Sequence, residues 1–191
     1  MELISINCHK DILINDIGIE RYNHSLRVMK VASELANRHD VNVEKAKIAA
    51  YYHDCAKFKS KTILLKRAES FDIINNSIMK KNIELIHAPL SAEIAKKDYG
   101  IKDKEILEAI KNHTTGGRYM SKLDKIIYLA DYIEPERNFP GVEIARKLAY
   151  EDLDKGMLFA LDNTIKYLID KKQLISTETV EIRNELLENL D

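Results

Sequence analysis

Apolar residues recur at helical spacing along most of this 191-residue chain, and that spacing restricts the fold more than any other feature of the sequence. The six glycines and three prolines are few for this length, so little interrupts a helix. Alternating apolar and polar patterns extend over only a few residues, and the chain lacks an Asn-Gly hairpin signal. The sequence therefore predicts an all-α protein.

We expect a series of helices of ordinary length. Pro89 suits the first turn of one helix, which Gly100 would end. The other helices are predicted at about residues 20–39, 43–57, 62–68, 72–82, 102–112 and 121–133, and two or three more complete the chain within 141–170 and 178–190. No linker, repeat or low-complexity segment divides the sequence, so residues 1–191 are predicted to form a single domain.

The charge balance argues against a partner that needs a strongly charged surface. The chain has 30 Lys and Arg and 31 Asp and Glu, whereas nucleic-acid-binding surfaces usually carry a basic excess. The two cysteines, Cys8 and Cys55, form no disulfide framework, which is typical of a reduced intracellular protein. The chain lacks a signal-peptide pattern, and its most apolar stretch, residues 126–133, is too short to span a bilayer. We therefore expect a cytoplasmic protein with neither nucleic acid nor membrane as partner.

His53 and Asp54 are adjacent in an alanine-rich stretch, and this pair is the strongest functional signal in the sequence. A neutral imidazole and a carboxylate are both good ligands for a divalent metal ion. An aspartate in an apolar stretch is rarely buried unless it is paired or coordinated. On a helix, Lys57 would lie one turn beyond the pair and on the same face. Two metal ligands beside a cation suit a phosphate substrate.

Four further residues extend this pair into a candidate site. His24 is near the start of one predicted helix, His87 lies just before another, and His113 lies just after a third. Asp131 belongs to a helix that is apolar on most sides, so it is predicted to be buried beside a strong partner. Alone, each of these residues is more often structural than functional, and only their combination indicates a metal centre.

Other residues receive a structural interpretation. Cys55 is predicted to pack, because no partner that would activate its thiol is evident. His9 and His39 lie among polar residues and are predicted to be at the surface. Asp124 lies two turns before Asp131, where it would either support the site or serve as a solvated or capping residue. Three arginines close in sequence to candidate ligands are by default ordinary surface charges: Arg21, Arg118 and Arg137.

An upstream histidine, an adjacent His-Asp pair and a downstream aspartate, in this order, resemble the HD metal-dependent phosphohydrolase superfamily. The finer pattern resembles one branch, the YqeK-like symmetrical diadenosine tetraphosphate hydrolases. The matching stretches are Arg-Tyr-Asn-His-Ser at 21–25, His-Asp-Cys-Ala-Lys at 53–57, His-Ala-Pro-Leu-Ser-Ala at 87–92, Asn-His-Thr-Thr-Gly at 112–116, and residues 123–137. Five motifs together are a more specific signal than the His-Asp pair alone.

The resemblance implies a helical bundle of the HD type, with a motif core at about 20–137 and C-terminal helices at 141–190, and a dinuclear metal centre. The implied ligands are His24, His53, Asp54 and Asp131 for one ion, and His87 and His113 for the other, with Asp54 bridging both. Iron is the metal that the resemblance implies, and the mixed nitrogen and oxygen ligands also suit manganese, cobalt or zinc. Two divalent ions would give this site a net positive charge, which attracts a polyphosphate.

The resemblance also implies a reaction. A water bridging the two ions would be acidified to hydroxide and would attack an inner phosphorus of diadenosine tetraphosphate, giving two ADP molecules. Asp54 and Lys57 are the predicted catalytic residues, Asp54 as the bridging ligand and Lys57 as a cation at the phosphate or the leaving oxygen. Arg21, Thr114 and Arg137 are predicted to bind phosphate together with Lys57.

The sequence leaves alternatives open for both activity and assembly. The chain could be another HD phosphohydrolase, such as a nucleoside monophosphatase or a cyclic-dinucleotide phosphodiesterase, or a regulatory module that binds nucleotide without turnover. A homodimer is an alternative to a monomer. The apolar stripe of the C-terminal helix, which includes Ile182 and Leu186, would dock on the chain's own core or on another subunit.

Overall fold

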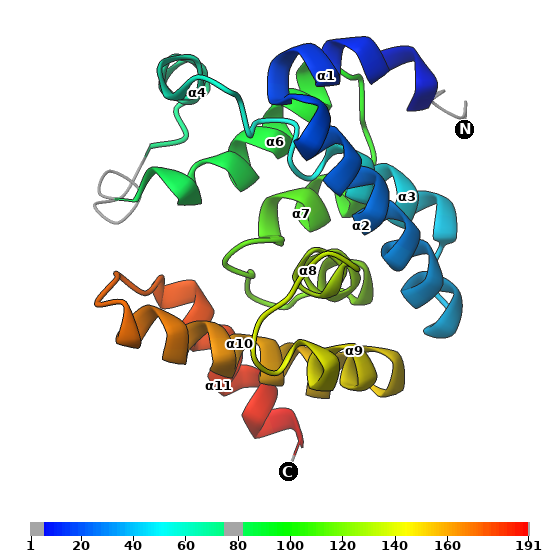
Figure 1. Cartoon of the computed structure of the whole chain (residues 1–191), viewed down its shortest axis with the longest axis vertical. Helices are drawn as coiled ribbons and strands as arrows, with labels where there is room; N and C mark the ends of the chain where they lie inside the picture. The colour runs from blue at the N-terminus through cyan, green and yellow to red at the C-terminus, as the bar shows by residue number, and fades with distance from the viewer. Residues whose placement is uncertain (1–5, 75–81, 191) are drawn as a thin grey trace.

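The computed structural model of the chain describes residues 6–74 and 82–190, and these residues form helices and no strand, as the helical spacing predicts (Figure 1). Their α-helices are α1 (Lys10–Ile17), α2 (Ile19–Arg38), α3 (Val43–Tyr52), α4 (Lys61–Ser70), α6 (His87–Lys97), α7 (Lys104–Asn112), α8 (Lys122–Ile133), α9 (Val142–Glu151), α10 (Leu153–Asp170) and α11 (Thr177–Leu190), and their short 3-10 helices are Ile6–His9 and Ile83–Leu85. One hydrophobic core extends from Leu13 in α1 to Leu186 in α11, so these helices form one domain.

Helix α8 lies at the centre of the molecule, where it contacts α2, α3, α7, α9 and α10. Figure 1 looks almost along its axis and shows α2, α3 and α7 on one side of it and α9 and α10 on the other. The side chains of Ile126, Ile127 and Leu129 are completely buried, because this helix is apolar around most of its circumference. Packing from several neighbours therefore fixes the helix that carries Asp131.

Helices α2 and α3 pack side by side and bring the upstream histidine next to the His-Asp pair. Asn42 caps α3 by accepting a hydrogen bond from the backbone N–H of Lys45. The small residues Ala46, Ala49 and Ala50 of α3 are fully buried, and small side chains let helix axes approach closely. The two candidate ligands that follow α3 are thereby held against α2.

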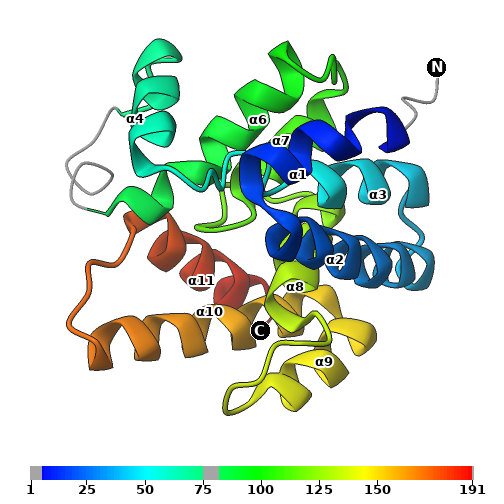
Figure 2. The ribbon, with the colours of Figure 1, turned by 45° about the horizontal axis from the view of Figure 1, so that its top comes forward.

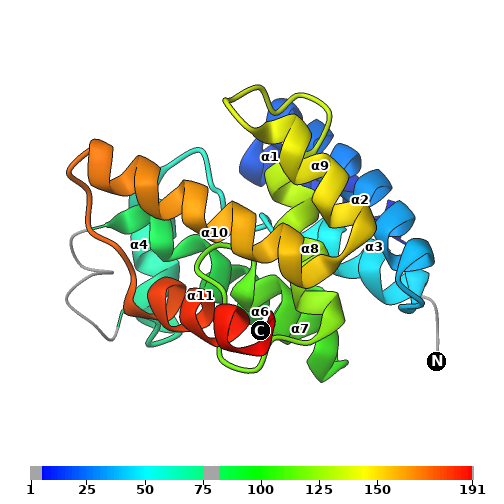
Figure 3. The same ribbon diagram turned by 90° about the horizontal axis from the view of Figure 1, so that it is seen from below.

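The C-terminal helices cover the other side of α8 and are nearest the viewer in Figure 3. Helix α10 contacts α8, α9 and α11, and Figure 2 shows α11 lying beside α10. Ile182 and Leu186 of α11 are buried in the core, whereas Leu187 is exposed. The apolar stripe of the C-terminal helix therefore docks mainly on the chain's own core.

Two predicted helices differ from the structure. The helix predicted for 43–57 ends at Tyr52, because the backbone N–H groups of Cys55 and Lys57 donate to carbonyls three residues earlier and form turns. The helix predicted for 72–82 falls mostly outside the described residues, and its described residues 72–74 and 82 are not helical. Helix α1 has no counterpart among the predictions. No helix within the described ranges combines the length and the apolar composition that a membrane span requires.

Candidate metal centre

Six side chains from separate parts of the chain meet beside α8. They are His24 of α2, His53 and Asp54 directly after α3, His87 at the start of α6, His113 directly after α7, and Asp131 of α8. Two overlapping triplets have ligand atoms that all lie within 4.8 Å of one another: His24, His53 and Asp131, and His53, Asp54 and His113. The fold thus brings together the six residues that the sequence predicts as metal ligands.

The carboxylate of Asp54 lies between two pairs of histidines and is only 2% exposed. Its Oδ1 atom is 3.3 Å from Nε2 of His87 and 3.5 Å from Nε2 of His113. Its Oδ2 atom is 3.5 Å from Nε2 of His53 and 3.8 Å from Nε2 of His24. Each carboxylate oxygen therefore faces a different pair of imidazole nitrogens.

Backbone contacts orient three of the four histidines. The Nδ1 atoms of His53 and His113 each lie 2.6 Å from the carbonyl oxygen of the residue three positions earlier, and His87 makes the same contact. When Nδ1–H donates to a carbonyl, Nε2 keeps its lone pair free to bind a metal ion. The short segments that end α3 and α7 and begin α6 therefore aim three nitrogen ligands at Asp54.

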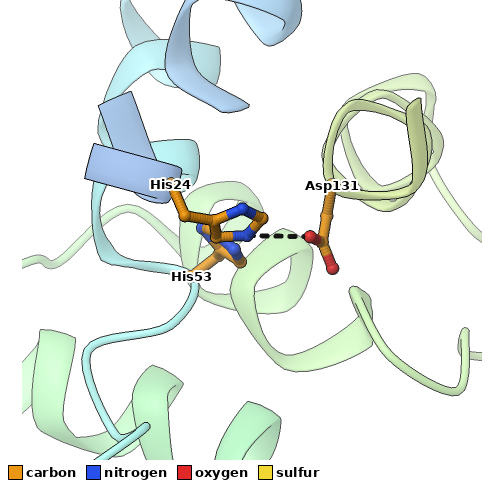
Figure 4. A group of neighbouring side chains, drawn as sticks. All are labelled: His24, His53 and Asp131. Carbon is orange, nitrogen blue, oxygen red and sulfur yellow. Dashed lines mark ion pairs between the residues drawn. The ribbon is translucent and has the colours of Figure 1, made fainter. Parts of the chain in front are cut away.

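His24 is oriented by side chains instead of a backbone carbonyl. Its Nδ1 atom is 3.3 Å from Oε1 of Glu134, and its Nε2 atom is 2.9 Å from Oδ1 of Asp131. Figure 4 shows Asp131 projecting from α8 toward the ring of His24, with His53 beside it. The His24 and His53 ring centroids are 5.4 Å apart. These three residues form one half of the centre.

Three buried atoms at the centre have no hydrogen-bond partner among the described residues: Nε2 of His24, Nε2 of His53 and Oδ1 of Asp54. The Nε2 atom of His24 is close to Asp131 but lacks the alignment of a hydrogen bond. Leaving a buried polar group unsatisfied generally costs about 1–3 kcal/mol. Because the three atoms belong to one buried cluster and combine nitrogen with oxygen, they fit divalent metal ions as ligands.

Both aspartates of the centre are held in the charged form. Burial alone would raise the pKa of Asp54, but the neighbouring His53 and His113 keep it well below its usual range. Partial removal from water likewise opposes the charge on Asp131, but the contact with His24 and the charges of His53 and Arg137 lower the pKa of that carboxyl strongly. A charged carboxylate is the form that binds a metal ion.

An open cavity of about 310 Å³ adjoins the centre. Its lining includes Asp54, His87, His113 and Asp131 of the centre and the four predicted substrate-binding residues Arg21, Lys57, Thr114 and Arg137. The remaining lining residues, called here the aromatic wall, are Tyr128, Tyr132, Phe139 and Thr164. The lining thus combines polar and basic groups with aromatic rings. A phosphate and a flat apolar group could be held side by side.

The structure corrects several predictions about side chains at this site. Asp131 is not buried, because its side chain faces the cavity and is 22% exposed. Arg21 and Arg137 are not ordinary surface charges: Arg21 Nη1 lies 2.9 Å from Asp54 Oδ2, and Arg137 Nη2 lies 2.6 Å from Asp131 Oδ1. Lys57 follows a turn rather than a helix, and its Nζ is 3.1 Å from an oxygen of the Glu84 carboxylate.

Other predictions concern residues outside the centre. His9 and His39 are half-buried rather than at the surface, because His9 Nδ1 is 2.6 Å from the Tyr52 hydroxyl and His39 Nε2 is 2.8 Å from a backbone carbonyl. Cys55 is buried and its thiol is in contact with a backbone carbonyl, as packing predicts. Arg118 pairs with an exposed glutamate at 3.0 Å. Asp124 belongs to the capping box with Ser121 that begins α8.

Glu134 is the site residue that the sequence analysis missed. It follows α8 directly, is 3% exposed, and contacts both His24 and Arg27. The sequence feature that could have indicated this role is the position of Glu134 between the end of an apolar helix and Pro135. From that position its side chain can turn back toward the core. The aromatic wall of the cavity likewise has no motif in the sequence that predicts it.

Comparisons with known proteins agree with this arrangement. A family model described as HD domain matches residues 21–136, a range that contains all six candidate ligands. The chain is 42% identical over 172 residues to the symmetrical bis(5'-nucleosyl)-tetraphosphatase of Halalkalibacterium halodurans, with 87% of this chain and 89% of the relative covered. It is also 42% identical over 159 residues to the protein of the same name from Bacillus subtilis, with 83% and 85% covered.

A solved structure from Clostridium acetobutylicum, described as a predicted HD superfamily hydrolase involved in NAD metabolism, shares the fold. It has a TM-score of 0.92 and 43% sequence identity to this chain, and the match covers 97% of this chain and 98% of the other. The similarity therefore includes the C-terminal helices beyond the range of the family model.

Proposed function

This chain belongs to the HD domain family, and we propose that it hydrolyses diadenosine tetraphosphate symmetrically. In this reaction one water molecule attacks an inner phosphorus, ADP leaves, and a second ADP is formed from the attacked half. Two relatives that match more than four-fifths of the chain carry the name of this activity, which supports the assignment of the substrate. The chain itself supports the chemistry through the arrangement of the carboxylate and four histidines.

The observation that carries the proposal is the position of Asp54. Its two oxygens face two separate pairs of imidazole nitrogens, and a carboxylate in that position can bridge two metal ions. We assign His24, His53, Asp131 and Asp54 Oδ2 to one ion, and His87, His113 and Asp54 Oδ1 to the other. When bound, such ions activate water for attack and stabilise the charge that develops on phosphate oxygens.

We propose iron as the metal at both positions. Imidazole and carboxylate ligands suit iron, and they also suit manganese, cobalt and zinc, so the ligand set supports the proposal without selecting one metal. Metal analysis of protein purified without a chelator tests it directly. Two equivalents of iron per chain are expected, and two equivalents of zinc or manganese from the same preparation would overturn the choice of iron.

The cavity supplies the remaining groups for a dinucleoside polyphosphate. Arg21 and Arg137 approach the carboxylates of Asp54 and Asp131 from the cavity side, where their guanidinium groups can also reach phosphate oxygens. The Thr114 hydroxyl lies 3.1 Å from His87 Nε2, which places a polar group beside the proposed second ion. These side chains bind and orient the phosphates without taking part in covalent chemistry.

Lys57 and the aromatic wall complete the proposed substrate contacts. Lys57 forms an ion pair with Glu84 at the rim of the cavity, and the Glu84 side chain is the more exposed of the two. A phosphate can replace Glu84 as the partner of Lys57 without leaving a buried charge unpaired. Tyr132 and Phe139 pack edge to face with ring centroids 4.8 Å apart, and aromatic rings of this kind pack against flat apolar groups such as a nucleobase. One half of the substrate could therefore lie with its base on this wall and its phosphates over the centre.

The cell compartment and the partners follow from the same proposal. Cys8 and Cys55 are both free thiols, which suits the reducing cytoplasm where nucleotides occur. We propose a small-molecule substrate and no nucleic-acid partner, because the net charge of −1 gives no basic excess. A homodimer is the assembly to test by light scattering, with a molecular mass of either one or two chains as the deciding result.

Product analysis tests the proposed reaction. Diadenosine tetraphosphate is incubated with metal-analysed protein, and the early products are separated by chromatography. ADP alone is the expected product, and AMP with ATP would show a different cleavage position. Nucleoside monophosphates and cyclic dinucleotides are run in parallel, since faster hydrolysis of either would favour another HD phosphohydrolase. The variant Asp98→Ala, which removes an exposed carboxylate outside the cavity, should keep full activity.

A further inference from the structure

Glu134 is a buried carboxylate whose contacts link α2 to the segment after α8. Its side chain is 3% exposed, and both of its oxygens are engaged. Oε1 lies 3.3 Å from Nδ1 of His24, whereas Oε2 accepts hydrogen bonds from Nε of Arg27 at 2.8 Å and from the backbone N–H of Glu136 at 2.9 Å. A buried carboxylate needs such partners, because an unpaired buried charge is strongly unfavourable.

His24 needs an external partner because of its position in a helix. His53, His87 and His113 lie at helix ends and use a nearby backbone carbonyl to fix their rings. His24 lies within α2, where the carbonyls of the preceding turn already accept the hydrogen bonds of the helix. Its Nδ1 atom therefore needs a partner other than these carbonyls, and Oε1 of Glu134 lies 3.3 Å from it.

Two arginines hold Glu134 in place from opposite ends. Arg27 lies one turn after His24 on the same side of α2, so the two residues meet Glu134 together. Arg146 of α9 donates to the backbone carbonyls of Ile133, Glu134 and Arg137 at 3.0, 3.0 and 2.9 Å. The carboxylate of Glu134 is thus held by α2 and its backbone by α9.

We propose that Glu134 is a positioning residue of the metal centre. It accepts a hydrogen bond from Nδ1–H of His24, fixes the ring orientation, and directs Nε2 toward the ion that His24 would share with His53 and Asp131. Glu134 lies outside the cavity lining, and its direct contact with the candidate ligands is the one to His24. Its Oε1 atom is also 3.9 Å from Nε of Arg137, which makes a closer ion pair of 2.6 Å with Asp131. This inference rests on the proposed metal centre. Partners of this kind commonly change metal affinity about 10- to 100-fold.

Metal titration of the apoprotein tests the inference. Cobalt(II) is added to the wild type, Glu134→Ala, Glu134→Gln and the control Glu136→Gln, and binding is followed by calorimetry and by the visible absorption of the bound ion. Glu136 also pairs with Arg27, at 2.7 Å, but it does not contact His24. We expect Glu134→Ala to bind the more weakly held ion about 10- to 100-fold less tightly than the wild type. The cobalt(II) affinity of Glu134→Gln should lie between those of Glu134→Ala and the wild type, and the affinity of Glu136→Gln should match that of the wild type.

Kinetics provide a second readout. At saturating cobalt(II), Glu134→Ala should regain most of its kcat with KM for substrate unchanged, because Glu134 acts through metal binding and Arg137 keeps its closer ion pair with Asp131. If Glu134→Ala binds cobalt(II) as tightly as the wild type, or if Glu136→Gln weakens binding equally, the positioning role is wrong. If the wild type itself binds no divalent ion, the proposed function fails before this inference is reached. Should Glu134→Ala fail to fold by circular dichroism, Arg27→Gln takes its place, and unchanged cobalt affinity there contradicts the inference.

Discussion

Asp54 occupies the one position in the centre from which a single side chain faces all four histidines. Its neighbour Lys57 has a different surrounding, because it lies at the rim of the cavity and pairs with an exposed glutamate. The type of residue alone therefore does not tell a candidate metal ligand from a candidate substrate contact. The burial of the side chain and the groups that it faces do. The two residues should respond differently to substitution.

Lys57→Ala should keep the metal and lose rate. The side chain is not among the groups that converge on the centre, but its ammonium lines the cavity and can stabilise charge on the phosphate or the leaving oxygen. We expect kcat to fall by about 100-fold, as for other groups that stabilise developing charge. The measurement is steady-state hydrolysis of diadenosine tetraphosphate together with metal analysis, with Lys59→Ala as the control at an exposed lysine outside the cavity. Loss of metal from Lys57→Ala would contradict its assigned role.

The helices of the domain depend on local capping and on close packing at particular residues. Asp103 caps α7 by accepting hydrogen bonds from the backbone N–H groups of Glu105 and Ile106, and it pairs with Lys45 of α3 at 2.9 Å. It thus stabilises both the start of α7 and the contact between α7 and α3. Because His113 follows α7 directly, this cap also supports the candidate site.

Asp103→Ala should destabilise the protein by about 1 kcal/mol at neutral pH. Burial opposes the charge of Asp103, but the hydrogen bond from Lys45 and those from the backbone lower its pKa in the folded state. A carboxyl with a lowered folded pKa stabilises the protein above its unfolded pKa and loses that contribution as the pH falls through the folded value. The difference in free energy of unfolding between wild type and Asp103→Ala should therefore shrink below about pH 4.

Denaturant unfolding at pH 7 and pH 3 measures this difference. Asp103→Asn serves as the matched control, since it keeps a capping oxygen but loses the charge, and its deficit at pH 7 should be smaller than that of Asp103→Ala. A deficit for Asp103→Ala that is larger at pH 3 than at pH 7 would contradict the assignment of the charged form.

Gly156 marks a close contact between α9 and α10. A Cβ atom there would lie 3.0 Å from Cα of Ala149 and 3.1 Å from its backbone nitrogen. Alanine normally favours a helix over glycine by about 1 kcal/mol, but this clash should outweigh the gain, because crowding a packed interface costs about 1–3 kcal/mol. We expect a lower melting temperature for Gly156→Ala than for the wild type. Lys155→Ala on the exposed neighbouring position should change it little, and a stabilised Gly156→Ala would contradict the packing.

The sequence pattern predicts the bounds of a helix well where apolar periodicity and capping residues agree. It fails where a backbone turn ends the helix before the apolar pattern ends. The helix ending at Ile133 follows from its apolar residues and the cap at Ser121. The end of α3 at Tyr52 does not, because the alanine-rich pattern continues to Ala56 while the backbone already turns. That turn matters, since it contains His53 and Asp54.

On the scale of the whole molecule, α8 organises the centre. Within the described residues it contacts α2, α3, α7, α9 and α10, it carries Asp131, and the segment after it carries Glu134 and Arg137. The six candidate ligands can be proposed from sequence motifs, because histidine and aspartate side chains are common metal ligands. The roles of Arg27 and Arg146 cannot be predicted in the same way. Their contacts depend on how helices distant in sequence pack, and no local sequence pattern shows that packing.

Metal removal should lower the stability of the whole domain. The ligands come from five separate segments, so bound ions would link those segments in the folded state and not in the unfolded one. An ion present at 100 times its dissociation constant stabilises by about 2.7 kcal/mol, which is about 5–10 °C in melting temperature for a domain of this size. Calorimetry of reconstituted and chelator-treated protein measures the shift. Equal melting temperatures would contradict a metal centre that joins these segments.

The bridging role of Asp54 is tested most directly by measuring metal content and diadenosine tetraphosphate turnover in wild type and Asp54→Ala side by side. Wild type should hold two ions per chain and produce ADP, whereas Asp54→Ala should hold fewer ions and lose turnover, because each oxygen of this carboxylate faces one histidine pair. Circular dichroism of both proteins verifies that the variant is folded. Full activity with two ions retained in folded Asp54→Ala would contradict the proposed centre.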